Sequence, residues 1–353
     1  MWGFAVPRID CLRAVAAALL VGSVLLGCSE GRSRSSTARS SSSLPVTAGA
    51  ATSSAPAPSA PAAAGRASAA PATAASAAPA PGWPLAITID DLPWVGKIRP
   101  GDSHASATER LLAALTRHGV VATGFVVCSQ LGTEGVAQQW VAAHMELGNH
   151  TSHHRDLNDG TVDAWIHDVR DCETPLTALT GSRPRFFRYP YLHQGTTIDR
   201  RDAAAAELAR MGYRVAQVTL HSHDWVFAAA YGKAINGQGG DAATIVRDYL
   251  SHVRLVASHA RERAQALEHR EIAQVMLIHA NALEAAELDA VLTELSAQGA
   301  RFVSLDEALN DAVYARPDGY AGPQSRNWLD HLAPVPSEGW DHTVEQSLLQ
   351  AMP

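Results

Sequence analysis

Aspartates and histidines of the kind that hold a metal ion occur at two places in this sequence. Asp90 and Asp91 directly follow a short apolar run, and His150 and His154 are separated by three residues. This spacing lets one helical turn or one tight loop direct both imidazoles at a single ion. With one carboxylate as third ligand, positions stay open for water and substrate, as a catalytic zinc site requires.

The spacing alone leaves alternatives open. Without context, a His-x3-His pair is more often a solvated helix face than a metal site. His153 is also close enough to His154 to be a rival ligand. Because an aspartate pair lies upstream at the end of another apolar run, we favour the metal site.

Candidates for proton transfer also follow apolar runs. His279 ends the run 275–278, and imidazole titrates near neutral pH, although a lone histidine at a strand end is more often structural. The metal needs only one of the two aspartates, so the other is free to act as a base or merely to cap a turn. Arg188 is expected to pair with Asp90 and keep it ionised, with a purely structural salt bridge as the competing account.

The elements that must position these residues alternate along the chain. Strands are predicted at about 85–89, 120–127, 185–191, 215–220, 275–279 and 301–305. Helices are predicted after a capping pair at Ser106 and Glu109, at 136–147 with Gly148 as its stop, and at 162–179, 199–211, 242–268 and 284–297. Such alternation implies parallel strands. With no GxGxxG or P-loop to indicate a nucleotide-binding sheet, we predict an α/β fold, a distorted (β/α) barrel of about seven or eight strands, with the reactive residues at its C-terminal face.

Five segments resemble, in order, the motifs of the polysaccharide deacetylase family, the NodB-homology group or carbohydrate esterase family 4. They are Thr88-Ile89-Asp90-Asp91, His150-Thr151-Ser152-His153-His154, Arg188-Tyr189-Pro190-Tyr191, His221-Ser222-His223-Asp224-Trp225 and Leu277-Ile278-His279. The resemblance covers about residues 84–310. It implies a NodB-type barrel that hydrolyses N-acetyl groups of amino sugars in a cell-surface or extracellular polysaccharide.

The same resemblance assigns roles around the metal. It makes Asp91, His150 and His154 the ligands of a divalent ion, with zinc expected first and cobalt, nickel or manganese as alternatives. It makes Asp90 the base that takes a proton from the attacking water and His279 the acid that protonates the leaving amine.

Further residues are assigned by resemblance to the walls of the site. Tyr191 is expected to offer a backbone N–H to the oxyanion, next to Pro190, and Trp225 and Leu277 are expected to line a pocket for the acetyl methyl. Asp224 is expected to tune His279.

The sequence also departs from the family pattern at two places. Leu92 replaces a usual glycine, and His221 replaces a usual aspartate. These departures put the substrate shape and the tuning of the acid in question, and leave the metal ligands and the base in place.

The start of the chain is typical of export. Arg8 and Arg13 precede an apolar run at 14–26, too short to span a bilayer, and Leu25-Leu26-Gly27-Cys28 resembles the bacterial lipoprotein box. We therefore predict a signal peptide at 1–27, lipidation of Cys28 and an anchor in the cell envelope, at the outer membrane if the cell has one. A plain secretory signal with an incidental Cys28 is the alternative.

Residues 28–83 are nearly all Ser, Ala, Pro, Thr and Gly, which predicts a disordered tether or a glycosylated stalk. The formal net charge of −7 gives no basic footprint for nucleic acid, and no protein partner is implied. The expected partners are an N-acetylated polysaccharide or oligosaccharide and, through the lipid, a membrane. Cys128 and Cys172 fit either a disulfide or two buried thiols.

Two stretches lie outside the motifs. Residues 226–270 are longer than the family needs, and we interpret them as an insertion rather than a groove wall. The tail 311–353 has no assigned role, and we expect Trp328 and Trp340 to pack under the barrel rather than stack on sugars. Alternatives for the whole chain are a metal-dependent amidohydrolase of small cyclic amides, a silent glycan-binding lipoprotein and, least favoured, a structural envelope protein.

Overall fold

The computed structural model of the protein describes residues 82–333, all of which fall in one compact unit. The predicted signal peptide, Cys28, nearly all of the tether, and the tail from residue 334, with Trp340, lie outside the described residues. Within the described range, no helix is both long enough and apolar enough to cross a bilayer.

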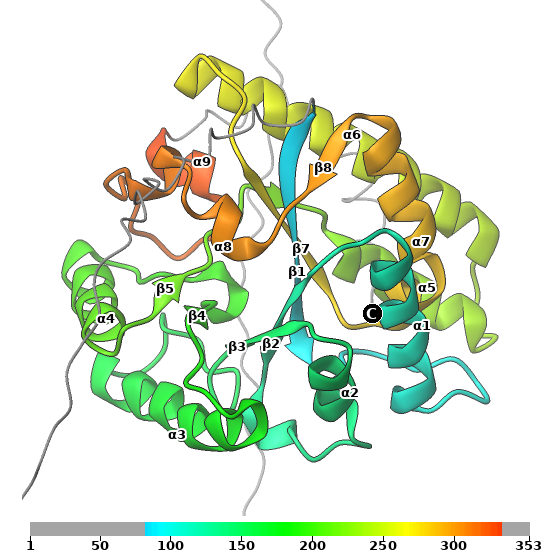
Figure 1. The fold of residues 1–353 in the computed structure, drawn as a ribbon, viewed down its shortest axis with the longest axis horizontal. Helices are drawn as coiled ribbons and strands as arrows, with labels where there is room; N and C mark the ends of the chain where they lie inside the picture. Colours follow the sequence, from blue (N-terminus) through cyan, green and yellow to red (C-terminus); the bar gives the residue numbers. More distant parts are fainter. Residues whose placement is uncertain (1–81, 334–353) are drawn as a thin grey trace, which may run out of the picture. The chain divides into compact units, whose positions relative to one another are not determined.

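One sheet of eight parallel strands lies at the centre of the described fold (Figure 1). The strand order is β5-β4-β3-β2-β1-β7-β6, and β8 pairs separately with β1. The strands are β1 (Trp83–Leu92), β2 (Thr123–Val126), β3 (Glu146–Asn149), β4 (Phe186–Phe187), β5 (Arg214–Val215), β6 (Leu220–His221), β7 (Gln274–His279) and β8 (Ala300–Phe302). The prediction of a distorted α/β barrel is confirmed.

Strand β1 is the central strand of the sheet and pairs with three others. One of its edges pairs with β7, and the other pairs with β8 near its start and with β2 near its end. Leu85, Ile87 and Ile89 pack in the large apolar core with the helices, and Ala86 packs with residues of the barrel interior. Because side chains alternate along a strand, Asp90 points inward on the same face as Ala86.

Strands β5 and β6 are two residues long each, and within residues 82–333 they do not pair with each other, so the sheet is not closed there. They form the two ends of the strand order, and only residues 216–219 separate them in the chain. The N–H of Trp328 donates to Val218 O in this connection, so a segment from far down the chain packs against the connection between the two end strands.

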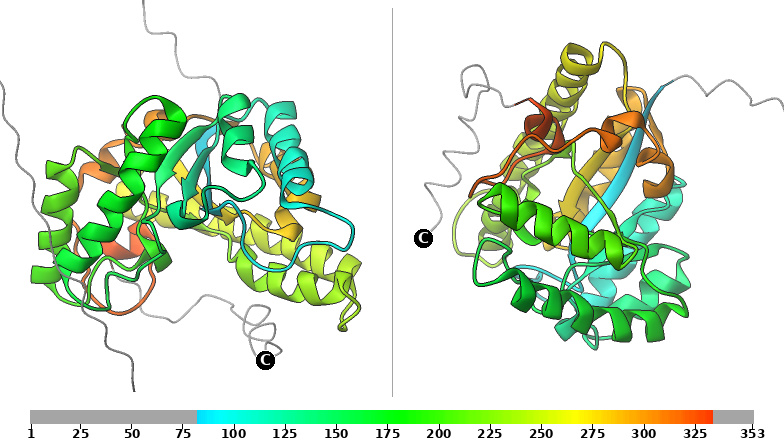
Figure 2. Two further views of the ribbon diagram at one scale, coloured as in Figure 1. Left: turned by 90° about the horizontal axis from the view of Figure 1, so that it is seen from below. Right: turned by 90° about the vertical axis from the view of Figure 1, so that its left-hand side faces the viewer.

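Helices surround the sheet (Figures 1 and 2). They are α1 (His104–Arg117), α2 (Val136–Ala142), α3 (Val162–Thr180), α4 (Ile198–Arg210), α5 (Asp224–Ile235), α6 (Ala242–Glu268), α7 (Ala282–Ala297), α8 (Leu305–Ala308) and α9 (Trp328–Leu332). Helices α5, α6 and α7 pack on one another, and α1 packs on α7. The helices predicted at 162–179, 199–211, 242–268 and 284–297 are confirmed.

Three local predictions are wrong. The cap of α1 is Ser103, whose hydroxyl accepts from Ser106 N–H, so Ser106 is the third helical residue and not the cap. The helix predicted at 136–147 ends at Ala142, and residues 146–149 form β3. Gly148 lies in β3 opposite Phe125 of β2, and it is a glycine because a Cβ at this position would collide with the ring of Phe125.

The strand predicted at 215–220 is in fact two strands, β5 and β6, separated by the connection described above. Leu92, which stands where the family has glycine, packs directly over Gly124, and a Cβ on Gly124 would collide with its side chain. Leu92 is therefore accommodated by a glycine on the neighbouring strand.

Candidate active site

The three predicted metal ligands lie together at the C-terminal ends of β1 and β3. Asp91 lies in the last part of β1, and His150 and His154 lie in the loop that follows β3. One ligand atom from each lies within 4.8 Å of the others. The Nε2 atoms of His150 and His154 are 3.4 and 3.1 Å from Asp91 Oδ1.

The carboxylate of Asp91 is arranged as a ligand atom would be. Its Oδ1 is buried and has no hydrogen-bond partner within residues 82–333, although two imidazole nitrogens lie beside it. A buried anion that faces two imidazole nitrogens without hydrogen bonds fits a divalent cation.

The tautomer of His150 also fits a metal ligand. Its Nδ1 lies 2.8 Å from the carbonyl oxygen of Arg188, which accepts only from a protonated Nδ1. The lone pair of the neutral ring is then on Nε2, which is the atom that faces Asp91. A second partner that fixes the ring and its tautomer is usual for metal-bound histidine.

The backbone around the ligands lies in a sparsely populated region. The φ angles are 60° at Asp91, 63° at Thr151 and 54° at His154, and none of these residues is glycine. Such left-handed residues cost free energy and cluster at functional sites. The chain therefore accepts backbone strain where it presents these ligands.

His153, the rival ligand, points elsewhere. Its Nδ1 lies 2.6 Å from Oδ1 of Asp168 on α3, and its side chain is 57% exposed. His154 thus lies next to Asp91, whereas His153 contacts Asp168, which is not one of the predicted metal ligands.

Asp90 and Arg188 form a buried pair beside the ligand group. Arg188 Nη1 lies 3.2 Å from both carboxylate oxygens of Asp90, and its other nitrogens donate to Thr88 Oγ1 and Ala216 O. The guanidinium also lies over the ring of Phe125, 4.7 Å from its centroid. The predicted pairing of Arg188 with Asp90 is present, and Arg188 can act only through Asp90 because it is itself fully buried.

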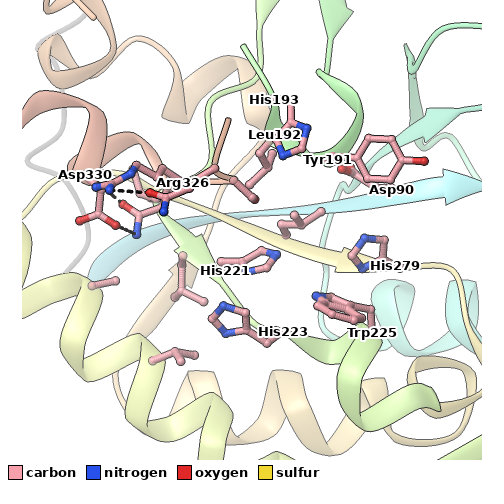
Figure 3. Close-up of a pocket in the computed structure, with 18 of the residues that line it drawn as sticks. Asp90, Tyr191, Leu192, His193, His221, His223, Trp225, His279, Arg326 and Asp330 are labelled. Atoms are coloured by element: carbon pink, nitrogen blue, oxygen red, sulfur yellow. Dashed lines mark hydrogen bonds between the residues drawn. The ribbon is translucent and has the colours of Figure 1, made fainter. Parts of the chain in front are cut away.

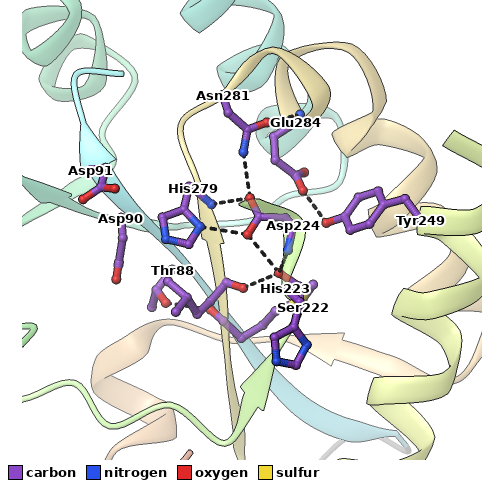
Figure 4. Close-up of polar contacts among 12 residues, drawn as sticks. Thr88, Asp90, Asp91, Ser222, His223, Asp224, Tyr249, His279, Asn281 and Glu284 are labelled. Atoms are coloured by element: carbon purple, nitrogen blue, oxygen red, sulfur yellow. Dashed lines mark hydrogen bonds and ion pairs between the residues drawn. The ribbon is translucent and has the colours of Figure 1, made fainter. Parts of the chain in front are cut away.

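His279 ends β7 directly across from Asp90 on β1, with which it is in register. Its Nδ1 lies 2.8 Å from Oδ1 of Asp224, and its backbone N–H donates to Oδ2 of the same carboxylate (Figure 4). Burial would lower the pKa of His279, but the charge and hydrogen bond of Asp224 raise it to about 9. His279 is therefore protonated at neutral pH, with Asp224 as a positioning residue behind it.

The remaining predicted residues divide between the cavity and its support. Tyr191 and Trp225 are partly exposed and line the cavity with Leu277. Pro190 is buried and does not line the cavity. It begins the turn in which Tyr191 takes a φ of 58°. The prediction of a substrate contact for Pro190 is therefore corrected to a role in shaping this turn.

The cavity extends well beyond the predicted residues (Figure 3). Its volume is about 1040 Å³. From the reacting end, marked by Asp90, Tyr191 and His279, it continues past His221 and His223 on the chain around β6 to Arg326 and Asp330. The residue at the altered motif position, His221, thus lines the cavity, and Asp224 supplies the carboxylate next to His279.

Sequence reasoning misjudged the walls of the far end. Val256, His259, Ala260 and Arg263 of α6 line the cavity, so the stretch 226–270 supplies a wall and is not merely an insertion. Residues 324–327, Leu329 and Asp330 line it from the predicted tail. Trp328 is 4% exposed, donates from Nε1 to Val313 O and packs with Ile272 just before the start of β7, so it does not stack on sugars. The sequence gives no pattern that predicts these long-range contacts.

Part of this chain matches known proteins. Residues 78–216 match the family model for polysaccharide deacetylase, and this segment contains Asp90, the three ligand residues and Arg188. The match supports a polysaccharide deacetylase domain in this part of the chain. A curated chitin deacetylase of Pestalotiopsis sp is 28% identical over 147 residues, which are 40% of this chain and 43% of that protein. This chain therefore matches less than half the length of that relative.

Solved structures with similarity to this chain include the chitin deacetylase from the fungal pathogen Colletotrichum lindemuthianum. It has 22% identity and a TM-score of 0.46, and the match covers 66% of this chain and 89% of that one. A CE4 family pseudoenzyme from Bacillus anthracis has 19% identity and a TM-score of 0.46, with 65% of this chain and 66% of that one covered.

Proposed function

We propose that this chain is a metal-dependent deacetylase that hydrolyses N-acetyl groups of amino sugars in an extracellular polysaccharide. The observation that carries the proposal is the convergence of Asp91, His150 and His154 beside a paired carboxylate, Asp90, and a protonated imidazole, His279. The set supplies ligands, a base and an acid around one point, which hydrolysis of an amide requires.

Asp90 is the base in this proposal. Arg188 holds both of its oxygens, and Thr88 and Ala216 hold the guanidinium in turn, so the carboxylate is fixed in place. It accepts the proton from the water whose oxygen attacks the carbonyl carbon of the acetamido group. A divalent ion bound by the three ligands would polarise that carbonyl and make the water more acidic.

His279 is the acid. An amine leaves an amide poorly unless its nitrogen is protonated. His279 holds a proton at neutral pH, because its pKa is raised to about 9 against the effect of burial by Asp224. It gives the proton to the amide nitrogen as the C–N bond breaks, so the products are acetate and a free amino sugar.

The cavity walls suit a sugar bearing an acetamido group. Leu277 and Trp225 line the cavity near His279 and provide apolar surface for the acetyl methyl. The backbone of Tyr191 is left-handed, and its ring lies 4.5 Å from that of His154, so this turn adjoins the ligand group. We assign the Tyr191 N–H to the oxyanion that forms in the reaction.

The proposed setting is the outside of the cell. The sequence Leu25-Leu26-Gly27-Cys28 supports cleavage before Cys28 and lipidation of its thiol. The disulfide between Cys128 and Cys172 supports an oxidising compartment. Intact-mass analysis of the chain from membranes, with Cys28→Ser as control, tests the anchor: an unmodified Cys28 contradicts it.

Acetate release tests the function. The purified chain would be incubated with acetylated chitooligosaccharides and with peptidoglycan, as isolated, after chelation and after zinc is restored. We expect release that is lost on chelation, returns with zinc and is absent in Asp90→Asn. Asp102→Asn is a matched control, because Asp102 pairs with Arg110 on the surface of the domain and does not line the cavity.

The outcomes separate the alternatives. A chain that binds one zinc ion and releases no acetate from either substrate contradicts the proposal and favours a small-amide hydrolase or a silent binder. Release that survives complete removal of the metal contradicts the metal dependence alone. The relative rates on the two substrates begin to define the polymer.

A further inference from the structure

A buried hydrogen-bond network lies behind His279, on the side away from Asp90 (Figure 4). Its centre is Asp224, which is fully buried at the start of α5. Its carboxylate accepts from His279 Nδ1 and from His279 N–H, both at 2.8 Å, and from Asn281 Nδ2 at 2.7 Å, while the hydroxyl of Ser222, 3.2 Å away, donates to Leu277 O at 2.7 Å. Three donors on one carboxylate fix its orientation.

Asn281 has two functions in this network. Its Oδ1 accepts from Glu284 N–H at 3.0 Å and so caps the first turn of α7, while its Nδ2 donates to Asp224. A flipped amide would direct an oxygen at the Asp224 carboxylate, so the two contacts together fix the orientation of the amide. Asn281 therefore ties the start of a long helix to the carboxylate that holds His279.

A second buried carboxyl, Glu284, adjoins the network but differs from Asp224. Its Oε1 accepts from Tyr249 OH, and its Oε2 has no hydrogen-bond partner in the described part of the chain. Burial and the nearby charge of Asp224 raise the pKa of Glu284 well above its usual range. The two buried carboxyls therefore differ in their surroundings: three donors hold Asp224, and one hydroxyl holds Glu284.

We propose that Asn281 is a positioning residue for the acid: through its amide it holds Asp224 in the orientation that keeps His279 aimed across at Asp90. This inference rests on the proposed function, because His279 is the acid only in that reaction. A simple capping role for Asn281 is the account to be excluded.

The N-cap preference supplies a sharp test. Asn, Asp and Ser cap helices about equally well, so Asn281→Ser and Asn281→Asp preserve the cap of α7. Neither can donate an amide N–H to Asp224, and the aspartate puts a second carboxylate beside it. The matched control is Asp241→Asn at the N-cap of α6, an exposed residue outside the cavity lining.

The measurements are kcat and KM for acetate release, zinc content and melting temperature. We expect kcat to fall about tenfold in Asn281→Ser and further in Asn281→Asp, since hydrogen bonds to charged groups contribute at this level. KM and zinc content should stay within about twofold of the wild-type values, as should kcat in Asp241→Asn. Wild-type kcat in both Asn281 variants would overturn the inference.

A spectroscopic measurement makes the test independent of activity. In zinc-loaded protein labelled with ¹⁵N-histidine, His279 Nδ1 should carry a proton held by Asp224, with His279→Gln identifying its resonance. We expect that resonance to shift or broaden in both Asn281 variants and to stay unchanged in Asp241→Asn. An unchanged resonance in the Asn281 variants overturns the inference, whereas a wild-type chain that releases no acetate counts only against the proposed function.

Discussion

The two sides of the candidate active site are constructed differently. On one side, a buried carboxylate oxygen of Asp91 faces two imidazoles and has no hydrogen-bond partner in the range 82–333. The backbone is left-handed at Asp91 and at His154. On the other side, the Asp224 carboxylate accepts from three donors, two of His279 and one of Asn281. The first side needs a cation to balance it, and the second is balanced by the chain itself.

This difference indicates how the two chemical tasks are divided. A ligand group must leave its lone pairs to the ion, so its polar atoms lack partners within the protein. A proton donor must keep one tautomer and one direction, so the groups behind it are saturated with hydrogen bonds. Perturbations of the two sides should therefore have different signatures.

The largest effect is expected from His154→Ala. Loss of a residue that only hydrogen-bonds to a metal ligand lowers metal affinity by up to about a hundredfold. Because His154→Ala removes a ligand itself, zinc affinity should fall by more than this, and acetate release should be lost. His153→Ala is the matched control one residue away, and should bind zinc normally. Zinc titration by calorimetry measures both. Equal losses in the two variants would contradict the assignment of His154.

The next effect is expected from Asp224→Asn, which should leave zinc binding intact. Since the charge of Asp224 is the main factor that raises the pKa of His279 to about 9, its loss lowers that pKa. In the wild type, activity should fall as pH rises through about 9, because His279 loses its proton there. In Asp224→Asn the fall should occur at lower pH, with kcat/KM at pH 7 reduced about a hundredfold.

A pH–rate profile measures this shift, with Asp248→Asn as the control because Asp248 is a partly exposed carboxylate on α6 that pairs with Arg247 and does not line the cavity. An unchanged alkaline limb in Asp224→Asn would mean that a group other than His279 is the acid.

Removal of the Cys128–Cys172 disulfide should have a smaller effect, and that effect should be confined to the metal-ligand side. Cys128 is bonded to Cys172 on α3, and its N–H donates to Thr151 O in the ligand loop. Replacing both cysteines by alanine should lower the free energy of unfolding by about 2 to 4 kcal/mol, measured by urea denaturation. Zinc affinity should fall several-fold, while the His279 resonance stays in place. A shifted His279 resonance with unchanged zinc affinity would contradict this, because it would show that the disulfide supports the acid side.

The smallest effect is expected from Glu284→Gln. A glutamine is nearly isosteric with the neutral acid and still accepts from Tyr249, so kcat should stay within about twofold. Acetate release and melting temperature check this. If Glu284→Gln lowered kcat/KM as much as Asp224→Asn does, Glu284 would have to act on His279 as strongly as Asp224, which contradicts the network described above.

The sequence predicted the parts of the site that lie close together in the chain. The strand ends before Asp91 and at His279 were predictable because apolar runs precede them, whereas the strand before His150 was mistaken for the end of a helix. Register then brought Asp90 opposite His279, which alternation alone could not predict. The choice of His154 over His153 depended on Asp168, fifteen residues further along.

Contacts across long stretches of chain escaped prediction. The helix predicted through Gly148 failed because the glycine is needed by Phe125 on the adjacent strand, a tertiary cause that local pattern does not contain. Asn281 is a good helix cap in any sequence, and its second bond to Asp224, 57 residues away, is invisible until the fold is known. The cavity wall formed by α6 and residues 324–330 escaped for the same reason.

The separation of the far cavity wall from the reacting residues has a consequence for evolution and engineering. Ligands, base and acid lie at strand ends or in the loop directly after β3, whereas the far end is built from α6 and residues 324–330. Segments outside the central sheet tolerate insertion and replacement more readily than its strands. Selection could therefore remodel which polymer fits the cavity while the hydrolytic residues stay fixed, and grafting that wall between relatives is a direct route to altered specificity.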